Sequence, residues 1–210
     1  MRGRGFARRV GLLGGSFNPA HAGHRHVAEV ALRALRLHEV WLLVSPGNPL
    51  KPEAGMAAFA ERLASARRVA APPRIRASAL EQRLRTALTW RSLSRIRRLW
   101  PRARFVFLIG ADNLLQLPRW RRWRRIIRLV PIAVLPRPGY VRAALRGQAA
   151  AVLRHARRRP AQLLAPPLAT PRWCFVPARM HAASATAIRA ARAEEGSRHG
   201  RGQGQQDQGA

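Results

Sequence analysis

The feature that most constrains the fold of this chain is a glycine-rich turn between a short apolar run and a helix-like pattern. The apolar run is Val10 to Leu13, and residues 14–24 read Gly-Gly-Ser-Phe-Asn-Pro-Ala-His-Ala-Gly-His. A strand that leads through such a turn into a helix directs backbone N–H groups and the positive end of the helix dipole toward one point. The sequence therefore predicts an α/β fold with an anion site at this turn.

Two glycines and two histidines in the turn suit such a site. Gly14 and Gly15 permit unusual φ values and a close approach of the backbone to a ligand. His21 and His24 are three residues apart, so near a helix start they lie on the same side and can donate hydrogen bonds to phosphate oxygens. The alternative is turn glycines with two unrelated surface histidines, which the length of the string and its position after a strand disfavour.

Strand-like and helix-like patterns alternate along the remaining chain. They predict strands at 40–44, 104–110 and 132–135, weaker strands at 74–77, 161–164 and 174–176, and helices at 57–70, 88–99 and 184–193. Residues 140–159, rich in alanine and arginine, are expected to form an exposed helix. Strands separated by helices predict a doubly wound parallel sheet with helices on both faces. In such a sheet, ligands bind beyond the carboxyl ends of the strands.

Length and composition fit one domain. The chain has 210 residues, of which 47% are hydrophobic, and we expect a single domain over 1–195 and a disordered polar tail at 196–210. No apolar run approaches the roughly 18 to 20 residues that span a bilayer, and the N-terminus lacks the apolar stretch of a signal peptide. These features predict a cytoplasmic protein without a membrane partner. Cys174 is the only cysteine, and its apolar neighbours predict a buried thiol.

The formal net charge is +31, and Lys51 is the only lysine, so arginine supplies nearly all the positive charge. Two interpretations compete: a nucleic-acid surface, or a general enrichment in arginine that places charge on every solvated face. The arginines occur in nearly every segment rather than in one arm, which favours the second interpretation. No specific nucleic-acid partner is therefore expected, although the positive field attracts anionic nucleotides.

A second polar turn follows the clearest central strand. It reads Gly-Ala-Asp-Asn at 110–113, and Asp112 is the only aspartate before residue 193. Gly110 permits a sharp exit from the strand, and the oxygens of Asp112 and Asn113 can accept hydrogen bonds from ribose hydroxyls or metal-bound water. The alternative role is a helix N-cap, which can coexist with binding.

Two further segments carry candidate ligand groups. Ser184, Thr186 and Arg189 lie near the start of the last predicted helix, where hydroxyls and a guanidinium suit triphosphate oxygens. Trp120 follows the Asp112 turn, so an exposed indole there can stack on an aromatic ring.

Together these strings resemble those of the bacterial nicotinate-nucleotide adenylyltransferases, in the nucleotidylyltransferase superfamily that carries the HxGH signature. The resemblance extends from Val10 to Arg192. It rests on the string at 14–24, Pro-Gly-Asn-Pro-Leu-Lys at 46–51, Gly-Ala-Asp-Asn-Leu at 110–114, Trp120, Arg-Pro-Gly-Tyr at 137–140 and Ser-Ala-Thr-Ala-Ile-Arg at 184–189. It implies a Rossmann-like nucleotidylyltransferase fold and an enzyme that joins ATP and nicotinate mononucleotide into nicotinate adenine dinucleotide and pyrophosphate, in NAD biosynthesis.

The resemblance also implies roles for individual residues. The residues that match the family's ATP site are Gly14, Gly15, Ser16, Phe17, His21, His24, Gly110, Asp112, Ser184, Thr186 and Arg189, of which His21, His24 and Arg189 would be catalytic. Those that match the mononucleotide site are Asn48, Lys51, Thr89 and Trp120. Mg²⁺ would arrive bound to ATP, without a dedicated protein site. Two positions depart from the family's pattern: Leu88-Thr89 replaces a frequent Tyr-Thr, and Asn18 replaces a frequent aspartate.

The implied chemistry requires no strong base, because the 5′-phosphate of the mononucleotide carries nucleophilic oxygens at neutral pH. Alignment with the α-phosphorus and stabilisation of the developing charge would supply catalysis. Another adenylyltransferase, such as pantetheine-phosphate adenylyltransferase, is the closest rival. A class I aminoacyl-tRNA synthetase fragment would need a lysine-rich loop, and a basic nucleic-acid-binding protein would leave the motifs unexplained. The choice between the acid and amide mononucleotides and the oligomeric state stay open.

Overall fold

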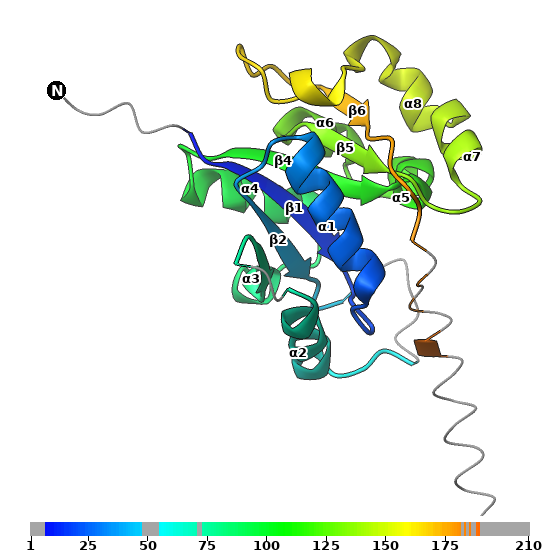
Figure 1. The fold of residues 1–210 in the computed structure, drawn as a ribbon. Helices are drawn as coiled ribbons and strands as arrows, with labels where there is room; N and C mark the ends of the chain where they lie inside the picture. The colour runs from blue at the N-terminus through cyan, green and yellow to red at the C-terminus, as the bar shows by residue number, and fades with distance from the viewer. Residues whose placement is uncertain are drawn as a thin grey trace, which may run out of the picture.

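In the part of the chain that the structure describes, six parallel strands form one sheet in the order β3-β2-β1-β4-β5-β6 (Figure 1). The structure, a computed structural model, describes residues 7–47, 55–70, 73–181, 183, 185, 188 and 189. The strands are β1 (Arg9–Gly15), β2 (Glu39–Val44), β3 (Ile75–Ser78), β4 (Arg104–Gly110), β5 (Ile132–Leu135) and β6 (Trp173–Phe175). All neighbouring strands run parallel, which confirms the predicted fold class.

Helices cover both faces of the sheet. They are α1 (Ala22–Ala34), α2 (Phe59–Val69), α3 (Leu80–Arg83), α4 (Thr89–Leu99), α5 (Ala111–Gln116), α6 (Trp123–Leu129), α7 (Val141–Arg146) and α8 (Gln148–Val152), with 3₁₀ turns η1 (Leu117–Arg119), η2 (Arg154–Ala156) and η3 (Pro160–Gln162). Helix α1 lies across the front of the sheet in Figure 1, and α2 belongs to the same apolar cluster. Helices α4 to α8 contribute to the cluster on the opposite face.

Most predicted elements are confirmed. The strands at 104–110 and 132–135 begin and end as predicted, and those at 40–44, 74–77 and 174–176 differ by one residue. The helices at 57–70 and 88–99 begin one or two residues later than predicted. The five inner residues of β4 are all buried, as expected for a central parallel strand covered on both faces. The tail at 196–210 and most of the helix at 184–193 lie outside the described residues.

The strand predicted at 161–164 is wrong. The chain makes a 3₁₀ turn over Pro160–Gln162, and Leu163 and Leu164 then turn inward and are buried. A short apolar run does not distinguish a strand from a buried turn. Here the two leucines complete the apolar cluster on the α1 face without joining the sheet.

The single exposed helix predicted at 140–159 is also wrong. Helix α7 ends at Arg146, and the extended backbone of Gly147 (φ −74°, ψ 166°) separates it from α8. Ala144, Ala149 and Leu153 are buried, whereas the arginines of this segment are exposed. Ala144, Ala149 and Ala150 therefore belong to the contact surface of two short helices that pack on the sheet.

The sheet register brings the ends of β1 and β4 level at the carboxyl edge. Leu13 pairs with Leu108, so continuing the register places Gly15 level with Gly110. The chain adds β2 and β3 on one side of β1 and then crosses to β4 on the other side, so the strand order reverses between β1 and β4. Open α/β sheets bind ligands in the crevice at such a point.

Gly14 and Gly15 do not use the conformational freedom expected of them. Both lie within β1, and neither has a positive φ. A Cβ at Gly15 would lie 3.2 Å from the ring of Phe17, so close packing rather than φ favours glycine there. The residue of the turn with a positive φ is Phe17, at 50°.

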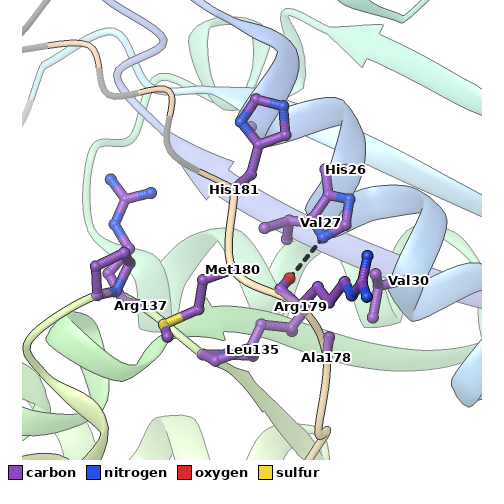
Figure 2. A pocket seen from close by; sticks show the side chains of 12 residues that line it. His26, Val27, Val30, Leu135, Arg137, Ala178, Arg179, Met180 and His181 are labelled. Atoms are coloured by element: carbon purple, nitrogen blue, oxygen red, sulfur yellow. Dashed lines mark hydrogen bonds between the residues drawn. The ribbon is translucent and has the colours of Figure 1, made fainter.

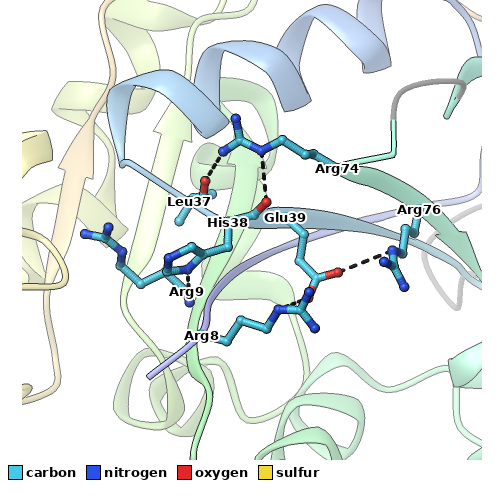
Figure 3. A network of polar contacts seen from close by, with 7 residues as sticks. All are labelled: Arg8, Arg9, Leu37, His38, Glu39, Arg74 and Arg76. Atoms are coloured by element: carbon cyan, nitrogen blue, oxygen red, sulfur yellow. Dashed lines mark hydrogen bonds and ion pairs between the residues drawn. The ribbon is translucent and has the colours of Figure 1, made fainter. Parts of the chain in front are cut away.

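The amino edge of the sheet carries a separate polar network (Figure 3). Glu39, at the start of β2, is buried, and its carboxylate oxygens lie 3.3 Å from Nε of Arg8 and 3.5 Å from Nε of Arg76. Nε of Arg74 donates to the carbonyl oxygen of His38 at 3.0 Å. These contacts join the beginnings of β1, β2 and β3, at the end of the sheet opposite the glycine turn, so the role of Glu39 is structural.

Cys174 lies in β6 and is fully buried, as predicted. Burial raises the pKa of its thiol to about 12, although the positive charge of Arg157 opposes the rise. None of the described helices combines the length and the apolar composition needed to cross a bilayer.

Candidate active site

Three separate stretches of the chain meet at the carboxyl edge of β1 and β4. The turn at 16–20 follows β1, residues 111–112 follow β4, and Arg189 comes from the end of the described chain. Nη1 of Arg189 donates to the carbonyl oxygen of Asn18 at 2.7 Å. The carbonyl oxygen of Ala183 lies 3.1 Å from the position of a Cβ built on Gly23. The fold thus gathers residues that the sequence analysis assigned to one anion site.

Helix α1 begins with two histidines acting as caps. Nδ1 of His21 accepts a hydrogen bond from the N–H of Gly23 at 3.1 Å, and Nδ1 of His24 accepts from the N–H of His21 at 3.2 Å. A ring nitrogen that accepts carries no proton, so the N–H of each ring is at Nε2. The ring centroids are 4.0 Å apart. The capping of α1 therefore places two Nε2–H donors side by side.

His21 is only 5% exposed. Burial, followed by the positive charges of Arg137 and His181, lowers its pKa from 6.5 to about 4. The ring is therefore neutral at neutral pH. Within the described residues, its Nε2 is buried and has no hydrogen-bond partner. A buried N–H group without an acceptor is rare in a native protein, and a ligand is one way to satisfy it.

Asp112 supplies a buried acceptor at the same edge of the sheet. It lies in the first turn of α5 rather than at the N-cap, which is Gly110. Its Oδ1 is buried without a partner in the described chain, and its Oδ2 lies 3.9 Å from Nε of Arg137. The charge of Arg137 also acts on His21, so the three side chains belong to one site.

Glycine is needed at position 110 because a larger side chain would not fit, and not because the chain makes the sharp turn after β4 that the sequence suggested. Its backbone is extended, with φ −75° and ψ 161°, which any residue can adopt. A Cβ there would lie only 2.3 Å from Oδ1 of Asp112. Glycine therefore lets the carboxylate fold back over the end of β4.

A pocket opens between α1 and the segments 135–138 and 178–181 (Figure 2). Apolar side chains line much of it, namely Val27, Val30, Leu135 and Met180, together with Arg137 and His181. Gly23 also belongs to the lining, so the pocket adjoins the start of α1. Nε2 of His26 donates to the carbonyl oxygen of Arg179 at 2.8 Å, which holds the second segment against α1. The pocket suits a flat apolar group attached to an anion.

Thr89 and Trp120 occupy the other side of the sheet. Thr89 is the first residue of α4, Trp120 follows η1, and both are partly buried. The indole of Trp120 packs edge-on against Phe107 of β4, with ring centroids 6.2 Å apart. A Cβ on Gly14 would lie 3.5 Å from the same Phe107 ring, which connects Trp120 to the end of β1. Four other predicted site residues lie outside the described residues: Asn48, Lys51, Ser184 and Thr186.

The sequence analysis gave no site role to three charged residues around this edge, although Arg137 belongs to the Arg-Pro-Gly-Tyr string that it quoted. Arg137 comes two residues after β5, and its position beyond a strand end is the signal that could have identified it. Arg62 and Glu81 are buried residues of α2 and α3. Burial raises the pKa of Glu81, while hydrogen bonds from the side chains of Ser92 and Ser45 oppose the rise. No sequence pattern separates Arg62 from the other arginines.

Comparisons with known proteins give consistent results. The chain matches the cytidylyltransferase-like family over residues 12–191. A protein of Gluconobacter oxydans named as a probable nicotinate-nucleotide adenylyltransferase is 56% identical over 184 residues, which cover 86% of this chain and 93% of that protein. A protein of the same name from Parvibaculum lavamentivorans is 52% identical over 182 residues, with 86% and 90% covered.

Solved structures share the fold. The nicotinic acid mononucleotide adenylyltransferase of Plasmodium falciparum, solved in complex with NaAD, superposes with a TM-score of 0.64 at 15% identity. The superposition covers 87% of this chain and 83% of that one. At this identity the likeness concerns the fold alone.

Proposed function

This chain belongs to the nicotinate-nucleotide adenylyltransferases, within the cytidylyltransferase-like family, and from that premise we propose how its carboxyl-edge site transfers an adenylyl group. The enzyme is a nucleotidyltransferase that joins ATP and nicotinate mononucleotide into nicotinate adenine dinucleotide and pyrophosphate. One observation carries the proposal: Nε2 of His21 and Oδ1 of Asp112 are buried and unpartnered in the described chain, and both residues interact with Arg137. A donor, a cation and an acceptor together suit the phosphates and ribose of a nucleotide.

The triphosphate binds at the start of α1. His21 and His24 donate from Nε2 to its oxygens, and the guanidinium groups of Arg137 and Arg189 balance its charge. Because the burial of His21 keeps its ring neutral, it acts as a hydrogen-bond donor of fixed direction rather than as an acid. The N-terminus of α1 adds the positive end of a helix dipole.

The adenine base occupies the pocket of Figure 2. The pocket adjoins the start of α1 through Gly23, so a base within it places its phosphates beside His21. Val27, Leu135 and Met180 offer apolar surfaces to the ring. Apolar walls with a few polar groups are the usual composition of a small-molecule pocket.

The mononucleotide binds on the α4 side of the crevice. Trp120 stacks on the pyridine ring with the indole surface that Phe107 leaves uncovered, since the two rings meet only edge-on. Thr89, at the first position of α4, offers a hydroxyl and a helix start. Asn48 and Lys51 complete this side of the site in the proposal.

Catalysis is alignment with charge stabilisation. The mononucleotide phosphate attacks the α-phosphorus in line with the departing pyrophosphate, and its own ionised oxygens make a general base unnecessary. The two histidines and Arg189 stabilise the charge that develops on the phosphoryl oxygens and the leaving group. Preorganised donors of this kind act without reorganisation at the moment of transfer.

Mg²⁺ enters with ATP in this proposal. Within the described ranges, no group of three or more histidine, cysteine, aspartate or glutamate side chains is placed to hold a metal ion. The unpartnered Oδ1 of Asp112 fits an ion that is already bound to phosphates, directly or through water. When bound, the ion withdraws charge from the phosphate oxygens.

A pyrophosphate-release assay tests the function. Purified enzyme receives ATP and Mg²⁺ with nicotinate mononucleotide, its amide counterpart or phosphopantetheine. We expect rapid release with a pyridine mononucleotide and a product with the mass of the dinucleotide. Release with phosphopantetheine alone would reassign the enzyme to the rival transferase, and salt-dependent nucleic-acid binding without any release would support the nucleic-acid alternative.

The variant His24→Ala tests the proposed histidine site. Loss of one preorganised donor lowers kcat by about 10²- to 10³-fold, because the charge on the phosphoryl group is no longer fully stabilised. The measurement is steady-state pyrophosphate release, with circular dichroism to confirm the fold. His155→Ala, at an exposed position, is the matched control and should keep the wild-type rate. Near-normal turnover of His24→Ala would contradict the assignment.

A further inference from the structure

A single buried arginine contacts both loops that the proposed function assigns to substrates. Arg62 of α2 is only 3% exposed. Its Nη1 donates to the carbonyl oxygens of Ser16, at 2.8 Å, and of Ser45, at 2.7 Å. Its Nη2 donates to the carbonyl oxygen of Pro46 at 3.2 Å. Ser16 belongs to the glycine turn, and Ser45 and Pro46 follow β2 and precede the predicted mononucleotide residues.

The partners of Arg62 are unusual for a buried cation. Its Nε donates to the carbonyl oxygen of Ala57 at 2.9 Å, and the guanidinium lies 5.4 Å from the ring centroid of Phe59. Among the described residues, no carboxylate forms an ion pair with Arg62, and the hydrogen bonds of its guanidinium go to carbonyl oxygens. Burial lowers the pKa of Arg62, although an arginine stays charged in a protein. Losing these acceptors would leave a buried charge uncompensated, which is strongly destabilising.

Because of the geometry of the peptide group, the contacts of Arg62 with carbonyl oxygens also fix the direction of the N–H groups that follow. In a trans peptide the C=O and N–H groups point in opposite directions. A contact to the carbonyl oxygen of Ser16 therefore directs the N–H of Phe17 away from the guanidinium, and a contact to Pro46 does the same for the N–H of Gly47. Both peptides are trans, and neither N–H has an acceptor within the described part of the chain.

We propose that Arg62 is a positioning residue that aims one backbone N–H at each substrate, Phe17 N–H at the triphosphate and Gly47 N–H at the mononucleotide. The proposal rests on the proposed function of the two loops. A planar guanidinium reaches several carbonyl oxygens at fixed angles, whereas a lysine ammonium is a compact charge that cannot reproduce this set. The spacing of the two loops, and with it the alignment of the two reactants, then depends on one side chain.

Helix α2 supports the same turn at a second point. The N–H of Ala20 donates to Oγ of Ser65 at 3.1 Å, and Ser65 is buried one turn after Arg62. The turn is also joined to the chain before α2, because Asn18 donates to the carbonyl oxygen of Gly55 at 2.8 Å. Arg62 differs from these contacts because it alone among them reaches the loop after β2 as well.

The first test compares Arg62→Lys with Arg67→Lys. Arg67 is an exposed residue of the same helix. The measurements are kcat and the KM of each substrate, from pyrophosphate release with ATP and nicotinate mononucleotide, alongside the melting temperature. We expect Arg62→Lys to lower kcat/KM by about 10²-fold for both substrates, because misalignment of about 1 Å has that effect. Arg67→Lys should match the wild type. A folded Arg62→Lys enzyme within twofold of wild type would overturn the proposal.

A second test leaves Arg62 intact, in case its variants do not fold. Gly47 has no positive φ, and no atom lies within 4 Å of a Cβ built there. Gly47→Pro removes the N–H, and Gly47→Ala keeps it. We expect the proline variant to have a KM for nicotinate mononucleotide at least about tenfold above that of the alanine variant, with similar KM values for ATP. Equal KM values for the mononucleotide would overturn the proposal.

The activity of the wild-type enzyme distinguishes a failure of the proposed function from a failure of the role proposed for Arg62. If it releases no pyrophosphate with either pyridine mononucleotide, the proposed function fails by itself. The role of Arg62 is then decided by calorimetric binding of ATP and nicotinate mononucleotide to the same variants. Weaker binding of both by Arg62→Lys supports the positioning role, and unchanged binding contradicts it.

Discussion

At the residue scale, the two ring nitrogens of His21 have different roles: one caps a helix, and the other is available to a ligand. Nδ1 caps α1, and this bond leaves the proton on the buried Nε2. The burial that makes Nε2 available to a ligand also disfavours the charged ring. The free energy of unfolding must therefore depend on pH in the acidic range because of this histidine.

We expect the protein to lose stability as the pH falls from 6.5 toward 4. In this range His21 binds a proton in the unfolded state but not in the folded state, so the free energy of unfolding decreases with falling pH. His21→Asn keeps a capping acceptor without ionising. Urea unfolding at pH 7 and pH 4.5 should show that the variant loses less stability than wild type, by on the order of 1 kcal/mol. His155→Asn, at an exposed site, should lose as much as wild type; equal losses for all three proteins would contradict the expectation.

A second residue-scale prediction concerns Gly110. In Gly110→Ala the new methyl group displaces the carboxylate of Asp112, which is the movable end of a side chain, so we expect the fold to persist. Turnover should fall by about tenfold or more, since the acceptor is misplaced. A double-mutant cycle with Asp112→Ala measures the coupling. If Gly110→Ala lowers kcat of the Asp112→Ala enzyme as much as that of wild type, the two residues act independently and the explanation fails.

The histidines could be predicted from the sequence, but the buried arginine could not. Spacing alone placed His21 and His24 on one side of a helix start, and the structure has their rings 4.0 Å apart. The role of Arg62 depends on four carbonyl oxygens that only the folded chain brings together. In a chain with 40 basic residues, nothing local marks one arginine as buried.

At the element scale, strands buried on both faces could be predicted best. The continuous apolar runs of β4 and β5 have no other stable environment than the centre of a sheet, so their bounds were predicted to the residue. The predictions at 140–159 and 161–164 were wrong because the alanines and leucines that are buried there pack on the sheet. The first segment is therefore not an exposed helix, and the second does not join the sheet as a strand. A local pattern of apolar residues predicts that a segment is buried, but it does not predict which element the segment packs against.

The edge strand β6 also depends on packing against a neighbouring element, and this dependence can be tested. It has only three residues, and Nε1 of Trp173 donates to the carbonyl oxygen of Leu153 at 2.9 Å, which joins β6 to the end of α8. Trp173→Phe removes this buried donor and should lower the free energy of unfolding by about 1–3 kcal/mol in denaturant titrations. Trp123→Phe, at a partly exposed position, is the control with a smaller expected effect. Equal losses would mean that the hydrogen bond contributes little.

At the scale of the whole molecule, the net positive charge is the feature that most affects how nucleotides approach the site. The net charge of +31 surrounds a site with a single described aspartate, so anionic nucleotides approach through a positive field. Arg137 and Arg189 concentrate that field at the carboxyl edge. Part of the apparent affinity for ATP must therefore come from residues that never contact it.

The corresponding prediction is a salt-dependent KM. Raising NaCl from about 20 to about 200 mM shortens the screening length and should raise the KM for ATP several-fold, with little change in kcat. The assay is initial-rate pyrophosphate release at constant free Mg²⁺, with an uncharged osmolyte as the control for water activity. A KM that does not change over this range would show that only contacts within the site determine nucleotide affinity.

The paired histidine caps of α1 also limit how this enzyme can be altered. Serine and aspartate are better helix caps than histidine, so a search for thermostable variants would tend to select them at position 21. Such a variant would keep its first helix and lose its donor to the nucleotide. Selection for heat resistance and selection for turnover therefore favour different amino acids at the same codon.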